Sequence, residues 1–146
     1  MNKYSEWLKA TRSKVKEDLN IYLEQEGLMT IKHFLSSSIG LEDKPLSIAV
    51  YPTSSGEASY TESEAGEISC RFTIAFYQNE DATEESMELI EKYFEAITSF
   101  ISNQTFGEES IIERADIIRM DDMEPVNGAV FLIKSRITSF ADYGWI

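Results

Sequence analysis

One ten-residue stretch, Ile68 to Tyr77, sets the strongest limit on how this chain can fold. Its sequence, ISCRFTIAFY, places large apolar side chains on alternate positions, which is the period of a β-strand with one buried face. After a polar break at 78–81, the spacing changes to three and four residues, and the apolar positions are Met87, Ile90, Phe94, Ile97 and Ile101. That spacing is typical of a helix lying on a sheet. The pattern therefore predicts a layered protein containing both helices and strands.

The rest of the chain supplies one more helix and three more strands. Residues 4–26 have an amphipathic helical pattern, with Ser5 as a candidate N-cap and Gly27 as a candidate residue just after the helix end. The second helix is predicted at 83–102, and further strands at 46–51, 111–120 and 129–140. Segment 28–40 fits either a short strand or a short helix.

This order, α-β-β-α-β-β, predicts an α+β fold with a four-stranded, mostly antiparallel sheet and two main helices packed on one face. At 146 residues, the chain is expected to form a single domain over 1–146. The strands at 46–51 and 68–77 should pair antiparallel across Thr53–Glu67, a long polar segment that is either a hairpin tip or a disordered loop. Asn127-Gly128 is a tight-turn signal before the last strand.

Negative charge is the strongest compositional signal. The formal net charge is −13; residues 1–26 hold five basic and five acidic residues, and residues 27–146 hold eight basic and twenty-one acidic ones. A surface of this kind repels nucleic-acid phosphates, so sequence-specific nucleic-acid binding is not expected. No apolar run approaches the ~20 residues that span a bilayer, so no membrane role is expected either.

The sequence shows no catalytic or cofactor motif. It lacks a glycine-rich phosphate loop, CxxC, HExxH and GxSxG. The single cysteine, Cys70, occupies a core-facing strand position, and the single histidine, His33, lies in an apolar segment, so both are interpreted as structural. A Mg²⁺ or Ca²⁺ cluster at Asp121, Asp122 and Glu124 lacks the spacing of a calcium loop. No cofactor, no metal and no enzymatic activity are therefore expected.

The order of segments resembles the tail terminator proteins of long-tailed bacteriophages, and the related neck and tail-completion proteins of prophages. The similarity runs from about Ser5 to Phe140. It is carried by Ile48-Ala49-Val50-Tyr51, by Phe72–Tyr77, by the Met87–Ile101 helix and by the Asp121-Asp122 turn. These features are specific in layout, and none is a catalytic fingerprint.

The resemblance implies a structural role in the virion tail, after assembly in the cytoplasm of the bacterial host. Such proteins form a ring, typically hexameric, that caps the tail tube and joins it to the head or neck. The implied partners are other copies of the chain, the tail tube protein and head–tail connector proteins. An acidic inner wall would let DNA slide through without gripping it, over about a Debye length of ~8 Å.

This interpretation suggests which residues face the channel or a neighbour, although solvated surface is the plainer reading for each of them. The acidic candidates lie in the 53–67 segment and the 121–124 turn, whereas two basic candidates on the last strand would meet acidic groups of the next subunit. These candidates are Glu57, Glu62, Glu64, Glu67, Asp121, Asp122, Glu124, Lys134 and Arg136.

The same charge excess supports a second hypothesis of a different class. A monomeric acidic inhibitor, such as an immunity protein or a DNA mimic, would bind a basic partner with strong salt dependence. The mass of the protein in solution separates the two hypotheses, because only the first requires self-association.

Overall fold

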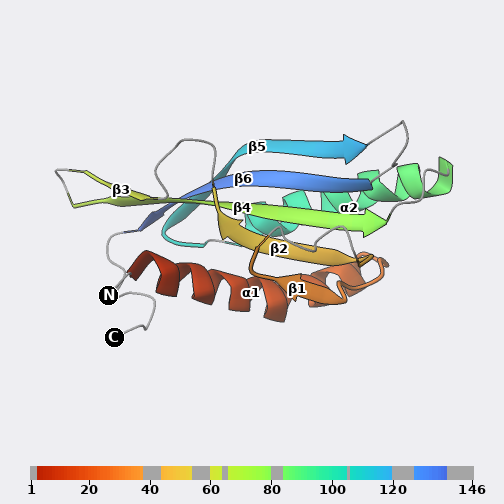
Figure 1. Ribbon diagram of the computed structural model, residues 1–146, viewed down its shortest axis with the longest axis horizontal. Helices are drawn as coiled ribbons and strands as arrows, with labels where there is room; N and C mark the ends of the chain where they lie inside the picture. Colours follow the sequence, from red (N-terminus) through yellow and green to blue (C-terminus); the bar gives the residue numbers. More distant parts are fainter. Residues whose placement is uncertain are drawn as a thin grey trace.

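Two helices lie against one face of a six-stranded, mixed but mostly antiparallel open sheet (Figure 1). The structure is a computed structural model that describes residues 3–37, 44–53, 60–63, 66–79, 84–104, 106–119 and 127–137. The helices are α1 (Lys3–Gln25) and α2 (Glu84–Asn103). The strands are β1 (His33–Leu35), β2 (Ser47–Pro52), β3 (Tyr60–Glu62), β4 (Ile68–Asn79), β5 (Glu109–Arg119) and β6 (Asn127–Ile137).

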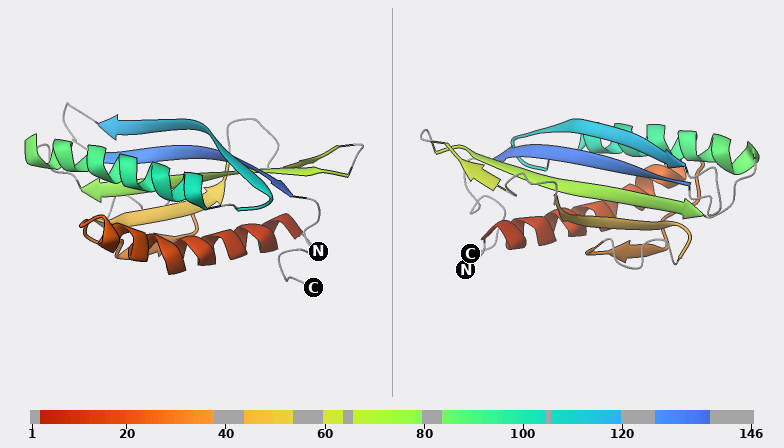
Figure 2. Two further views of the ribbon diagram at one scale, coloured as in Figure 1. Left: turned by 180° about the vertical axis from the view of Figure 1, so that it is seen from behind. Right: turned by 45° about the horizontal axis from the view of Figure 1, so that its top comes forward.

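The strand order across the sheet is β1-β2-β4-β6-β5, and β3 pairs with the first residues of β4. All these pairs are antiparallel except β1 with β2. The predicted antiparallel pairing of β2 with β4 is confirmed, with Ala49 opposite Ala75. Both helices cover the same side of the sheet, and the β3–β4 hairpin extends past the rest of the sheet at one end (Figure 2). The α+β class is therefore as predicted.

The predicted four-stranded sheet was wrong in strand number, because β1 and β3 add two short strands and the order becomes α-β-β-β-β-α-β-β. Each of these strands has only three residues. Three residues are too few to assign a strand by alternation alone: segment 28–40 fitted either a strand or a helix, and every residue of β3 is exposed. Segment 28–40 thus contains a strand, and the described part of 53–67 forms a hairpin with β4.

The ends of α1 show one wrong and one confirmed prediction. Ser5 is not the N-cap, because the helix already begins at Lys3. Gly27 does end the helix: its φ is 74°, the Leu28 N–H donates to the Leu23 carbonyl at 2.9 Å, and the Gly27 N–H donates to Glu24 at 3.0 Å. This pair of bonds is a Schellman motif, which satisfies the last carbonyls of the helix and favours glycine at the left-handed position.

The hydrophobic core lies between the helices and the helix-facing side of β4 and β6. Phe72 is fully buried and its ring meets those of Trp7 from α1 and Phe106, with centroids at 5.5 and 5.6 Å. From α2, Tyr93 packs on Phe76 at 4.8 Å. Edge-to-face and tilted ring pairs of this kind add to the free energy gained by burying their apolar area. The alternate apolar side chains that predicted β4 therefore pack against both helices.

The Asn127-Gly128 turn was predicted wrongly, because both residues belong to β6. Asn127 is buried, and its side-chain amide donates to Asn79 Oδ1 at 3.3 Å and to Ser86 Oγ at 3.2 Å. Gly128 lies against β4, where an added Cβ would be 2.6 Å from the carbonyl oxygen of Phe76. The glycine serves a close approach of two backbones rather than a tight turn.

Candidate functional site

The sheet face that carries neither helix holds the two basic residues selected from the sequence. Lys134 and Arg136 point to this face of β6, opposite Arg71 and Ser69 of β4, as their alternation with the buried Ile133 and Ile137 predicted. We call this surface the open face of the sheet; Figure 1 views the molecule from this side.

Arg136 is already bound by carboxylates of its own chain. Its guanidinium contacts Glu67 at 2.9 Å and Glu109 at 3.3 Å, and these contacts raise the pKa of Arg136 above its ordinary value. The structure therefore brings Glu67 and Arg136 together within one subunit, where a contact with the next subunit was hypothesised. Lys134 forms no ion pair with any other described residue.

Further acidic groups on the open face also lie next to arginines. Arg71 contacts Glu113 at 3.3 Å, and Arg114 contacts Asp116 at 2.6 Å. Exposed pairs of this kind contribute only about 0–1 kcal/mol each. The arginines nevertheless compensate part of the negative charge of this face. Two large apolar side chains of β5 are also exposed, Ile111 at 50% and Ile118 at 41%.

The acidic hairpin is the second predicted surface. At its base, Tyr60 of β3 stacks on Tyr4 of α1 with centroids 5.7 Å apart, and the Tyr4 hydroxyl donates to the Arg71 carbonyl at 2.6 Å. The Ser63 N–H donates to the Glu67 carbonyl at 2.8 Å across the turn. The hairpin is thus fixed to the start of α1, and Glu62 lies exposed on it.

Five of the nine candidate residues lie outside the described residues. They are Glu57, Glu64, Asp121, Asp122 and Glu124. Among the residues that the structure does describe, no group of three or more His, Cys, Asp or Glu side chains could hold a metal ion.

Cys70 is buried on β4, as its core-facing position predicted. Burial raises the pKa of its thiol to about 12. The thiolate is the nucleophilic form, so this side chain is a small apolar core residue at neutral pH.

A basic groove on α1 was not selected from the sequence. Lys9, Arg12 and Lys16, spaced three and four residues apart, share one side of the helix and line a shallow groove of about 230 Å³. The opposite wall is formed by Phe34 and Leu35 of β1, with Ser36 beyond them. The spacing was the available signal, and it was overlooked because the balanced charge of 1–26 suggested a neutral helix.

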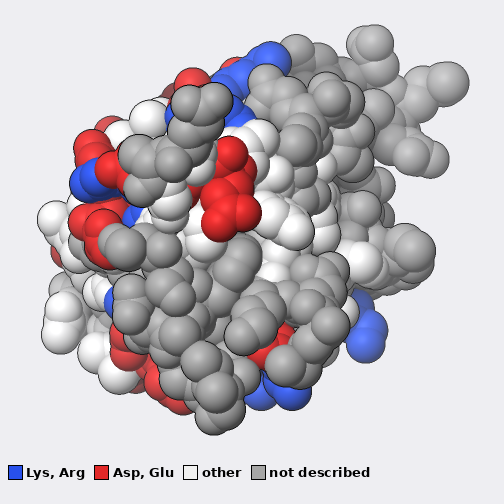
Figure 3. Space-filling view, turned by 90° about the vertical axis from the view of Figure 1, so that its left-hand side faces the viewer, with Lys and Arg blue, Asp and Glu red and all other residues white. Residues whose placement is uncertain are grey.

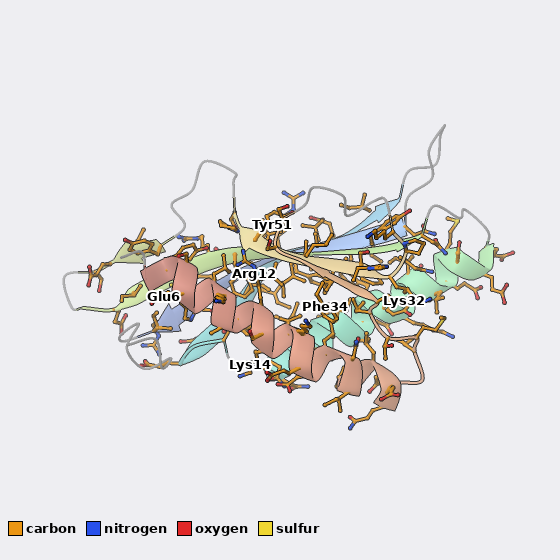
Figure 4. All side chains as sticks on the ribbon, turned by 60° about the horizontal axis from the view of Figure 1, so that its bottom comes forward. Glu6, Arg12, Lys14, Lys32, Phe34 and Tyr51 are labelled. Carbon is orange, nitrogen blue, oxygen red and sulfur yellow. The ribbon has the colours of Figure 1, made fainter. Side chains whose placement is uncertain are left out.

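Arg12 holds this groove together. Its Nε donates to the Val50 carbonyl at 2.7 Å and its Nη2 to the Ser36 carbonyl at 3.3 Å, so one side chain joins α1 to β2 and to the end of β1. Figure 4 shows Arg12 between the helix and these strands, with Phe34 nearby. Burial lowers the pKa of the guanidinium, and no described carboxylate forms an ion pair with it.

Acidic side chains are exposed on α2 and at the hairpin end of the molecule. One side of α2 presents an exposed stripe at helical spacing: Glu84, Glu88, Glu91 and Glu95. Figure 3 looks onto the end of the molecule that carries the hairpin, where acidic groups cover more of the coloured surface and basic groups lie mainly towards the margin. The structure therefore shows uneven charge, with a basic groove on an acidic body.

Comparison with known proteins does not assign the chain to a family. No family model matches the chain, and no curated protein sequence matches it. Neither of the two described helices is long and apolar enough to cross a lipid bilayer.

Proposed function

We propose that the protein is a non-enzymatic structural subunit of a phage or prophage tail, which assembles into a ring that caps the tail tube and joins it to the head or neck. The observation that supports this function best is the hairpin of β3 and β4, which projects beyond the sheet and carries exposed polar side chains. A projecting element of this kind suits contact with a neighbouring subunit. The order of the long elements also agrees with the resemblance to tail terminator proteins.

The test is the mass of the purified protein by light scattering, from dilute to high concentration, followed by electron microscopy of negatively stained samples. We expect growth towards a closed ring. Adding the tail tube protein of the same phage or prophage should then place rings at tube ends and stop tube growth. A chain that remains monomeric both alone and with the tube would contradict the proposal.

A second candidate, a monomeric acidic inhibitor, has one observation in its favour. The exposed glutamate stripe of α2 repeats at about 5–6 Å, which is the kind of regular negative array that a basic protein surface can bind. Against it, the described acidic groups of the open face that contact arginines are compensated within the chain. This function requires a strict monomer whose affinity for a basic protein falls steeply with salt.

A further inference from the structure

We propose that the basic groove of α1 receives the acidic β3–β4 hairpin of a second copy of this chain. The inference rests on the self-association in the proposed function and deepens it, because it names the two surfaces that meet. The groove is formed by Lys9, Arg12 and Lys16 on one side and by Phe34 and Leu35 on the other. No described residue that lines it is acidic.

The positive charge of the groove is unmatched among the described residues. Lys9 and Lys16 are exposed, and no ion pair within the described ranges involves either of them or Arg12. Glu6, Glu17 and Asp18 line a neighbouring hollow that shares Lys9 and Ser13 with the groove. In a chain of net charge −13, three unmatched cations on one helix side therefore form a favourable place for an acidic segment.

The same chain carries a segment of complementary charge. Residues 53–67 contain four glutamates and no lysine or arginine. Within the described part of this segment, Glu67 is bound to Arg136, whereas Glu62 is exposed and forms no described ion pair. The apolar walls of the groove also match the hairpin, because Tyr60 is 46% exposed at the same strand.

The described part of the hairpin, 60–63 and 66–67, lies at the start of its own α1 and extends away from the groove. Tyr60 is stacked on Tyr4 near the beginning of α1, and Lys16 lies about 18 Å further along the helix at the usual helical rise. Figure 2 shows the hairpin extending away from α1 rather than back along it. We therefore assign the contact to a second subunit. Because hairpin and groove are different patches, the contact is head-to-tail, and head-to-tail contacts close into rings when the rotation allows.

Two charge-reversed full-length variants test this assignment. The groove variant is Lys9→Glu with Lys16→Glu, which leaves the structural bonds of Arg12 intact. The hairpin variant is Glu62→Lys with Glu64→Lys. In the groove variant, two glutamates of the groove meet the acidic hairpin, and in the hairpin variant, two lysines of the hairpin meet the basic groove, so we expect self-association to weaken by about tenfold or more. Circular dichroism and thermal unfolding verify that each variant is folded.

Mixing the two variants should restore assembly. An acidic hairpin of the groove variant then meets the basic groove of the hairpin variant, and the reverse pair also has opposite signs, so alternating rings can form. A single chain that carries all four substitutions should likewise assemble. The matched control is Lys44→Glu with Lys92→Glu, which makes the same charge change at exposed lysines outside the groove and should leave assembly unchanged.

The outcomes separate this inference from the function on which it rests. Rings that form equally well from the groove variant would overturn the groove assignment and leave the ring function standing. Loss of assembly that mixing does not restore would also overturn it, and would assign the basic groove to a different acidic partner. A wild-type chain that stays monomeric at every concentration, with and without tail tubes, would remove both proposals.

Discussion

At the scale of single residues, Gly128 shows how close β4 and β6 approach. A Cβ at this position would be 2.6 Å from the Phe76 carbonyl oxygen, which is backbone and cannot swing away. We expect Gly128→Ala to destabilise the protein by about 1–3 kcal/mol, as overpacking of a core does. Urea denaturation followed by circular dichroism measures this loss.

Gly66→Ala is the control for Gly128. A Cβ there meets nothing within 4 Å, but φ is +83°, so the substitution reports conformational strain of about 1 kcal/mol without a clash. If Gly128→Ala were no more destabilising than Gly66→Ala, the close approach would not be energetically important.

Cys70 provides a second residue-scale prediction. With a thiol pKa of about 12 and a buried side chain, the folded protein should not react with a thiol reagent such as dithionitrobenzoate at pH 8. One equivalent should react at once after unfolding in guanidinium. Rapid reaction in the absence of denaturant would contradict the buried position.

Tyr93 links folding to alkaline pH. Burial raises the pKa of its phenol to about 12, and its hydroxyl donates to the Met29 carbonyl at 2.8 Å. The folded state holds this proton more tightly than the unfolded state does. The protonated phenol therefore stabilises the fold fully below pH 10, and this stabilisation is lost as pH rises towards 12.

Tyr93→Phe should remove the part of the alkaline loss of folding stability that Tyr93 causes. It should also lower the free energy of unfolding at pH 7 by about 1 kcal/mol, since the bond to Met29 disappears. Chemical denaturation from pH 7 to 11 measures both effects. An unchanged pH profile in the variant would show that other groups cause the alkaline destabilisation.

At the scale of elements, the Arg12 side chain joins α1 to β2 and to the end of β1. Arg12 donates to the carbonyls of Val50 and Ser36, and removing the donors leaves the Val50 carbonyl without that partner. We expect Arg12→Met, which keeps an apolar stem, to cost about 1–3 kcal/mol in urea denaturation. Lys16→Met on the same helix side should change stability by less than about 0.5 kcal/mol. Equal effects would mean that the helix is held by apolar packing alone.

The long elements could be predicted because their periodicity covers ten or more residues. The predicted strand at 68–77 and helix at 83–102 lie within one or two residues of β4 and α2, and the inward and outward residues of β6 were assigned correctly. Of the two short strands, β1 lies in segment 28–40, which fitted either a strand or a helix, and β3 was not predicted. β1 is held by parallel pairing with β2, which its own sequence does not reveal. β3 is held by backbone pairing with β4 and by one ring stack.

The candidate site could be predicted only in part. Whether a surface charge is available to a partner depends on which opposite charges the fold places beside it, and the sequence does not show this. Sequence position showed that Arg136 faces outward, but not that Glu67 and Glu109 lie beside it. The basic groove was missed for a related reason. A balanced number of charges over 1–26 conceals the fact that Lys9, Arg12 and Lys16 line one groove whereas Glu6 and Glu17 line the neighbouring hollow.

At the scale of the whole molecule, the proposed contact predicts how assembly responds to salt. An interface of exposed charges weakens as the Debye length falls from ~10 Å at 0.1 M to ~3 Å at 1 M. The association constant from sedimentation should therefore decrease with sodium chloride. Association through the apolar groups of the open face would instead strengthen with sulfate, because excluded salts favour burial of apolar surface.

The two borders of the sheet differ in a way that bears on how the protein behaves when crowded. On one border, β1 and β3 offer only three residues each. On the other, β5 is eleven residues long and no described strand pairs with its outer side, but its register shifts between Ile112 and Arg114, and Glu113, Arg114 and Asp116 are charged. Short strands, irregularities and charges are the features that discourage strand-to-strand aggregation. Many copies held close together should therefore remain separately folded, and we expect them to join through side chains rather than merge into fibrils.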